Sequence, residues 1–158
     1  MLRSAVVALI AGCIAEAAIA QESRYIDATS PKQAVGMMVV TARTAGMMET
    51  ECGKRFSDTL PAIRSSMQAW RQRDGRLADA AESEFATAAR AHASLQTQVD
   101  EALDSIFQAR FVTPYVSVDA ATRDRGIRAR CETYFGELAS GVWRQRTPNV
   151  YKYLEGAR

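Results

Sequence analysis

The stretch FATAARAHASLQTQVDEALDSI, residues 85–106, carries the clearest structural signal in the chain. Its seam positions alternate at intervals of three and four: Phe85, Ala88, His92, Leu95, Val99, Ala102 and Ile106. This alternation is typical of helices that pack nearly parallel or antiparallel. We therefore predict one long helix, closed by Pro114. A seam of about 30 residues would extend roughly 45 Å, so we expect this helix to bend or protrude.

Three further helices are predicted from start and stop signals: Ser30-Pro31 to Cys52-Gly53, Pro61 to Asp74-Gly75, and Asp119 to Pro148. Capping residues and first-turn prolines mark the starts, and glycine or proline marks the ends. Four helices with short connections predict an all-α fold, an antiparallel helical bundle.

Composition agrees with one helical domain. The chain has 158 residues, of which 47% are hydrophobic, enough for a single folded core. With 9 glycines and 4 prolines it is poor in turn residues, which disfavours a β-rich fold. The net charge of +2 creates no strong field, so we expect no nucleic-acid partner. No linker or repeat divides the chain, and we expect one domain over residues 21–158.

The first twenty residues have the layout of a secretory signal peptide. Arg3 precedes an apolar run, and small residues, Ala18 and Ala20, stand before polar Gln21. Glu16 interrupts the run well before the roughly 20 apolar residues that a membrane span needs. We expect cleavage after Ala20 and a periplasmic or secreted protein.

A second reading of the same segment is a lipoprotein. Ile10-Ala11-Gly12-Cys13 resembles the lipobox of bacterial lipoproteins, in which the cysteine is acylated and anchors the chain. The segment before Cys13 is short for this, and the residues after it are apolar where a polar tether is expected. Cleavage after Ala20 is therefore our first expectation, and anchoring through Cys13 is the alternative.

Both readings leave Cys52 and Cys131 as the cysteines of the folded part. An even pair in an oxidising compartment predicts a disulfide. It would join the end of the first helix to the apolar stripe of the fourth, and closing so long a loop is worth about 4–5 kcal/mol.

The candidates for site chemistry are few. His92 is the only histidine, and without a second histidine or a Cys-x-x-Cys-His motif it is a poor metal or haem ligand. We expect it to be a polar residue on the helix seam. We expect no metal, no cofactor and no catalytic residue.

Charge patterning offers a binding hypothesis. The predicted third helix has an acidic outer face, whereas the fourth carries Arg123, Arg125, Arg128 and Arg130. One interpretation is that these faces are solvated in the folded protein, since exposed ion pairs contribute only about 0–1 kcal/mol each. The alternative is that the arginines, with Trp70, contact a partner, because a guanidinium binds phosphate or carboxylate in a forked geometry. Such a partner would be an envelope or secreted protein, or anionic lipid or polysaccharide.

One segment resembles a known group of proteins. Cys52-x-x-x-Phe56, then Leu60-Pro61 and Trp70-Arg71-Gln72-Arg73-Asp74, is similar to a pattern in small exported helical proteins of proteobacteria. The resemblance covers about 23 residues, and Phe56 and Pro61 are separated here where the pattern often has them adjacent. It implies an exported, disulfide-tied bundle and carries no activity with it.

Motifs for catalysis are missing from the sequence: there is no Gly-x-Ser-x-Gly, P-loop, Gly-x-Gly-x-x-Gly or His-Glu-x-x-His. We therefore expect a non-enzymatic exported protein that binds another macromolecule in the cell envelope. The alternatives are a small-molecule or metal carrier that uses the bundle interior, with methionines and His92 lining it, and a carboxylate-based hydrolase.

Overall fold

The computed structural model describes residues 26–156, and the expected signal segment with Cys13 lies outside this range. Within it every regular element is helical, which confirms the all-α class. The elements are α2 (Pro31–Arg55), η1 (Ser57–Thr59), α3 (Leu60–Ala91), α4 (Ser94–Phe107), η2 (Gln108–Val112), η3 (Thr113–Tyr115), α5 (Ala120–Ser140), α6 (Val142–Arg146) and α7 (Pro148–Gly156). The described range therefore holds six α-helices, and the expected number of about four was too low.

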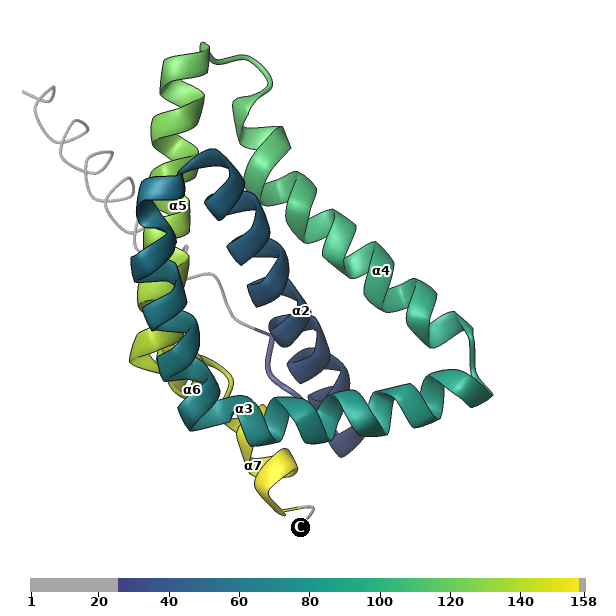
Figure 1. Cartoon of the computed structure of the whole chain (residues 1–158). Coiled ribbons are helices and arrows are strands. Elements are labelled where there is room, and N and C mark those ends of the chain that lie inside the picture. Colours follow the sequence, from purple (N-terminus) through teal and green to yellow (C-terminus); the bar gives the residue numbers. More distant parts are fainter. Residues whose placement is uncertain (1–25, 157–158) are drawn as a thin grey trace, which may run out of the picture.

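The first correction concerns α3, which continues through the expected stop at Asp74-Gly75 and runs to Ala91. Glycine inside a helix costs only about 1 kcal/mol, and buried contacts around Asp74 offset this cost. Figure 1 shows that the axis of α3 changes direction sharply along its length, so the helix bends instead of ending. The stop signal was therefore misread.

The second correction is the break at His92, where the single long helix was expected. His92 has φ −138° and ψ 85°, outside the helical region, and separates α3 from α4. Residues 91–94 are all exposed, and none of them has a bulky apolar side chain. Residues that keep the spacing of three and four but lack bulky apolar side chains gain little free energy from packing, so the chain turns back at this point.

The third correction concerns the C-terminal part. Gly141, with φ +77°, ends α5 in the left-handed conformation that glycine adopts without strain. Pro148 is the first residue of α7 and does not end the preceding helix. Proline is readily accommodated at the first position of a helix. The helix expected from Asp119 to Pro148 is thus two helices, α5 and α6.

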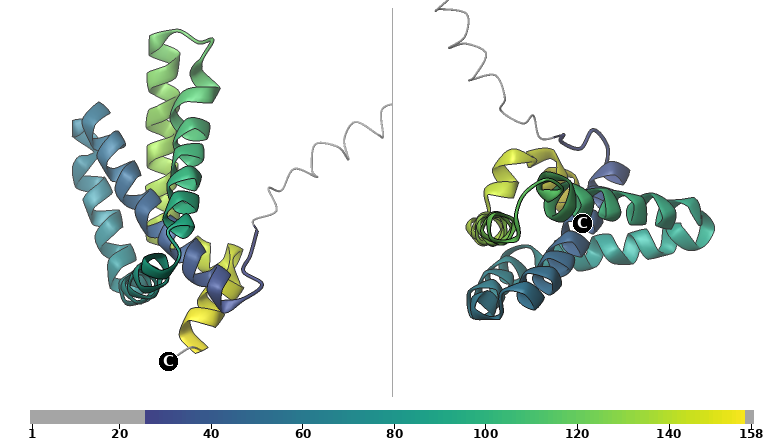
Figure 2. Two further views of the ribbon diagram at one scale, coloured as in Figure 1. Left: turned by 90° about the vertical axis from the view of Figure 1, so that its right-hand side faces the viewer. Right: turned by 90° about the horizontal axis from the view of Figure 1, so that it is seen from above.

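The helices are arranged around α2. It packs against α3, α5, α4 and α7, and Figures 1 and 2 show it near the middle of the molecule. The first part of α3 and all of α5 lie together on one side of it. The second part of α3 turns away, and α4 returns along the other side to meet the start of α5. None of the helices between residues 26 and 156 combines the length and apolar character that a bilayer crossing requires.

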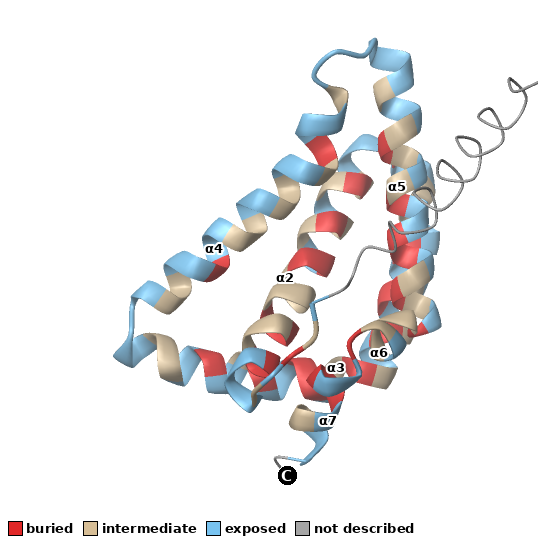
Figure 3. Cartoon of the chain, turned by 180° about the vertical axis from the view of Figure 1, so that it is seen from behind, coloured by how far each residue is buried: buried red, intermediate tan, exposed pale blue. Residues whose placement is uncertain are grey.

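Burial is concentrated on the inner faces of α2, α3 and α5 (Figure 3). α2 contributes Met38, Val39 and Met48, all at most 1% exposed. In contrast, α4 contributes a single buried residue, Val99, and its outer face is exposed. α4 is therefore the most weakly held of the long helices.

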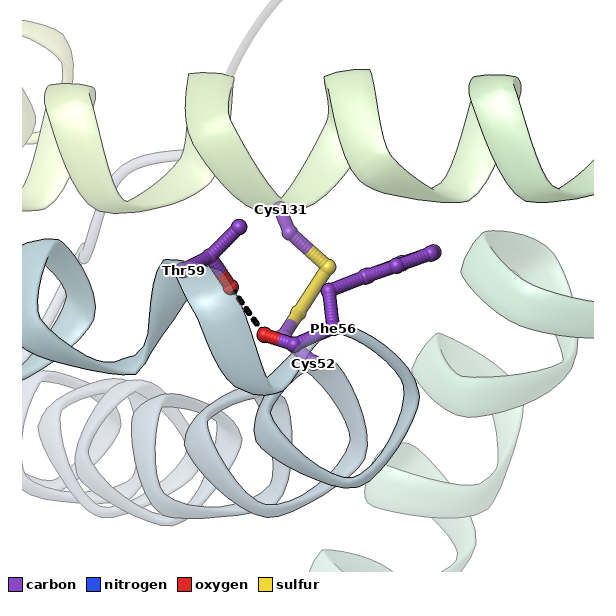
Figure 4. The surroundings of a disulfide bond; sticks show 4 residues. All are labelled: Cys52, Phe56, Thr59 and Cys131. Carbon is purple, nitrogen blue, oxygen red and sulfur yellow. Dashed lines mark hydrogen bonds between the residues drawn. A yellow bond between two sulfur atoms is a disulfide. The ribbon is translucent and has the colours of Figure 1, made fainter.

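The Cys52–Cys131 disulfide, expected from the sequence, is present and joins α2 to α5 (Figure 4). The Cα atoms are 6.0 Å apart, and the two residues are 0% and 1% exposed. Phe56, at the end of α2, lies beside the bond and is held by a hydrogen bond to its carbonyl oxygen from the Thr59 hydroxyl, at 2.7 Å. The bond thus fixes helices that lie 79 residues apart in the chain.

A buried carboxylate fixes the C-terminal helices. Asp74, 1% exposed, accepts hydrogen bonds from Nε of Arg73 at 2.9 Å and from Nε of Arg144 at 2.8 Å. The other nitrogens of Arg73 donate to the carbonyl oxygens of Leu138 and Ala139, both at 2.7 Å. These carbonyls end α5 and have no partner within the helix. We call these four interactions the Asp74 clasp; it joins α3, α5 and α6.

The start of the described chain is tied to its end. The Asp27 carboxylate accepts hydrogen bonds from the backbone N–H groups of Asn149, at 3.0 Å, and Val150, at 3.2 Å. Both donors belong to the first turn of α7, and the Val150 N–H also donates to the Thr147 carbonyl oxygen at 3.2 Å. Asp27 therefore acts as a remote cap for that helix.

Candidate binding surface at the tip between α4 and α5

The connection between α4 and α5 forms one end of the molecule (Figures 1 and 2). It consists of the single π-helical turn η2, the 3₁₀ turn η3, a short turn and the start of α5. We call residues 108–125 the tip. Its exposed side chains and its charges distinguish it from the rest of the described surface.

Three valines of the tip face solvent. Val112 is 39% exposed, Val116 75% and Val118 40%. Among the described residues, the only other large hydrophobic side chain that is exposed to this degree is Ile26, at 76%. Exposed apolar side chains scattered singly are ordinary, but three within seven residues form a local patch.

Two aromatic residues hold the base of the tip. Phe111 is 3% exposed and packs against Phe107, with ring centroids 5.3 Å apart. Tyr115 lies against Gly126 of α5, where an added Cβ would be 2.7 Å from the tyrosine ring. Glycine leaves room for the ring in this position, and a larger residue at 126 would displace it, so this contact seats the tip on α5.

The start of α5 is capped within the tip. The Asp119 carboxylate accepts a hydrogen bond from the backbone N–H of Thr122 at 2.9 Å. The Thr122 side chain and, to a smaller extent, this backbone hydrogen bond hold the pKa of Asp119 below its usual value, so the cap is charged at neutral pH.

The tip and the part of α5 that follows it, up to residue 130, carry a net positive charge. Residues 108–130 contain five arginines and two aspartates, and no carboxylate occurs from 108 to 118. Arg123 contacts its neighbour Asp124 at 3.3 Å, and Arg125 donates to the Thr122 hydroxyl at 3.1 Å. Both make only local contacts on the surface of their own helix and lie beside the exposed valines along the chain.

The other two arginines from the sequence hypothesis have structural contacts. Arg128 makes two hydrogen bonds to the Asp58 carboxylate, at 2.7 and 3.1 Å, and its guanidinium lies 4.6 Å from the Phe56 ring centroid. The pairing lowers the pKa of Asp58 and raises that of Arg128. Arg130 donates to the carbonyl oxygen of Ala109 at 3.4 Å and so links α5 to η2.

A groove of about 370 Å³ runs between η2 and α5, next to the tip. Arg110 and Arg130 line it, together with Tyr134. The Arg110 guanidinium lies 5.2 Å from the Tyr134 ring centroid, and burial raises the pKa of the Tyr134 hydroxyl. Two guanidinium groups, a neutral phenol and the Glu137 carboxylate, which pairs with Arg146, therefore line the same groove.

Two residues singled out in the sequence lie elsewhere. Trp70 is 4% exposed and belongs to the core, so its expected role as a partner contact is not supported by its position. Its place at i+7 from Ile63 on the inner face of α3 explains this burial. His92 is exposed at the end of α3 and does not lie on a packed seam, because the helix breaks there.

Other candidate sites are weaker. Across residues 26–156 no group of three or more His, Cys, Asp or Glu side chains is placed to hold a metal ion. An apolar hollow of about 200 Å³, lined in part by Met37, Met38, Trp143 and Tyr151, is smaller than the roughly 300–1,000 Å³ of typical small-molecule pockets. A hollow between α2 and α3 is lined mainly by polar side chains such as Glu49, Arg64 and Arg71.

Sequence reasoning missed the valines, Tyr115 and Gly126. The run from 111 to 118, FVTPYVSV, is apolar and free of charge, and it lies between two helices. A non-periodic apolar connection of this kind is the signal that could have indicated an exposed patch.

No family model matches the chain, and neither a curated protein nor a solved structure shows significant similarity to it.

Proposed function

We propose that this chain is an exported, non-enzymatic helical protein that binds another macromolecule of the cell envelope through the tip. The observation that carries the proposal is the three exposed valines within residues 112–118, which Arg123 and Arg125 follow along the chain. The apolar surface that these valines leave in water would be buried favourably by a partner.

The charge order on α5 supports a role in binding. The four arginines precede Glu132 and Glu137, and no acidic residue lies in the first turn of the helix. The Asp119 cap and Asp124 agree with the helix dipole, but the order of the arginines and the two glutamates is the reverse of the one that the dipole favours. A local arrangement that does not serve helix stability is often found at a functional surface.

Export is supported by two features. The N-terminal segment has the pattern of a cleaved signal, and the buried Cys52–Cys131 disulfide fits an oxidising compartment. A mass measurement on the mature protein tests this part. Cleavage after Ala20 gives a soluble chain that begins at Gln21, whereas a diacylglyceryl group on Cys13 would identify a lipoprotein.

Site-specific crosslinking in cells tests the binding role. A photoreactive amino acid is placed at Val116 and, as a matched control, at Ile26, which is equally exposed at 76% but lies outside the tip. We expect adducts with lipid or protein from position 116 and few from position 26. Equal crosslinking from both positions, or none from either, would contradict the proposal.

A further inference from the structure

We propose that the partner of the tip is an anionic phospholipid bilayer, whose head-group region receives the valines while the arginines bind its phosphates. This inference rests on the proposed function and names the class of partner. It follows from the shape, the charge and the rigidity of the tip.

The connection that carries the valines lies at an extremity of the molecule (Figure 1). A projecting end of a protein can touch a flat surface without other contacts, and a fluid surface can admit side chains without a preformed pocket. Val116, the most exposed of the three valines, is small and projects from a base held by Tyr115. This geometry suits shallow insertion into the boundary between head groups and acyl chains.

The charges around the valines select the head group. Arg123 and Arg125 make only local contacts, Arg123 with Asp124, and Arg110 and Arg130 line the adjoining groove. The five arginines of residues 108–130 outnumber the two carboxylates there, Asp119 and Asp124. A guanidinium presents a planar pair of donors that matches phosphate, and basic residues near an anionic membrane gain about 1 kcal/mol each.

Charge elsewhere would orient the molecule. The exposed carboxylates of α4, Asp100, Glu101 and Asp104, all precede η2, so none belongs to the tip. Repulsion between these groups and an anionic surface would hold α4 away and favour contact through the α5 side of the tip.

The test uses the protein purified from the periplasm with its disulfide intact. Sedimentation with vesicles of phosphatidylcholine alone, or of phosphatidylcholine with 30% phosphatidylglycerol, gives a partition coefficient. We expect binding to the anionic vesicles only, weakening as salt is added. Arg125→Gln should lower the coefficient about fivefold, from the roughly 1 kcal/mol of one arginine, and Val116→Asp should lower it at least about tenfold.

Matched controls are available on the same chain. Arg71→Gln removes an exposed arginine of α3, and Ile26→Asp places the same charge at an equally exposed apolar position. Both should bind as the parent protein does. Thermal unfolding verifies that each variant is folded, and Val116→Ser provides a milder change with the same expected direction.

A direct readout comes from Val116→Trp, whose emission should shift to shorter wavelength when anionic vesicles are added. The inference is overturned if the parent protein does not bind these vesicles, or if the Val116→Asp and Ile26→Asp variants bind equally well. If vesicles fail while Val116 crosslinks to a protein in cells, the lipid partner is wrong and the proposed binding role stands. If both experiments fail, the lipid partner and the proposed binding role are both contradicted.

Discussion

Replacing both Cys52 and Cys131 by alanine should lower the free energy of unfolding by about 4.5 kcal/mol. The bond closes a loop of 79 residues, for which the chain-entropy relation gives about 15 cal/mol/K at 298 K. Domains of this size are stable by about 5–15 kcal/mol in total. The variant is therefore expected to retain only a small margin of stability.

Urea unfolding measures this change. With a slope of about 2 kcal/mol per molar urea, the midpoint should fall by about 2 M. The reduced parent protein serves as a comparison, since it loses the loop closure but keeps both sulfur atoms in the core. A larger loss in the alanine variant than in the reduced protein would measure the packing contribution of the sulfurs.

The burial of the bond gives a kinetic check. Because Cys52 is 0% and Cys131 1% exposed, a reductant reaches the sulfurs only when the structure opens locally or globally. Reductant should have no effect on the alanine variant. The reasoning would be refuted if the variant unfolded at the parent's urea concentration, or if both thiols reacted freely in the native protein.

Three further predictions concern individual side chains. Asp74→Asn should destabilise the fold by roughly 2–4 kcal/mol, because it leaves two arginines without their buried counter-charge; the exposed Asp79→Asn on the same helix should change stability by less than about 0.5 kcal/mol in the same urea assay. Carboxyl NMR should show that Asp58 has a lower pKa than an ordinary aspartate, because Arg128 stabilises its charged form. The ion pair therefore stabilises the fold at pH values above the ordinary aspartate pKa, and this stabilisation is lost as the pH falls through the lowered pKa of Asp58. Arg128→Gln should return the pKa of Asp58 towards its ordinary value. Gly126→Val should displace the tyrosine ring of the tip, seen as faster amide exchange over residues 108–119, and unchanged exchange there would contradict the fitted contact.

Local signals predicted the elements whose causes are local. Ser30 caps α2 by accepting a hydrogen bond from the Gln33 N–H at 3.3 Å, as the sequence indicated. The end of α2 was expected at Cys52-Gly53 and lies at Arg55, within the usual uncertainty of helix ends. The disulfide could also be predicted, because two cysteines remain, and allow one pairing, once Cys13 is assigned to the predicted signal segment.

Boundaries set by distant residues could not be predicted. Asp74-Gly75 has the local chemistry of a stop, but a contact from Arg144, 70 residues later in the chain, stabilises the continued helix. At His92 the spacing of the seam is maintained while the side chains become too small to pack, so the period alone was misleading.

The candidate site was predicted in part. The sequence indicated the arginine-rich start of α5 but could not tell that Arg128 is engaged by Asp58, whereas Arg123 and Arg125 make only local contacts. The exposure of the valines depends on which residues of the connection pack inward, and that is decided by the fit of Tyr115 on Gly126.

The tie between Asp27 and α7 has a consequence for the order of folding. The Asp27 carboxylate meets donors 122 and 123 positions later, so this contact cannot form until almost the whole chain has been released. A nascent chain would then lack a complete structure for most of its synthesis. For the exported protein that we propose, this tie would close last, after α2, α3 and α5 had emerged from the translocation channel.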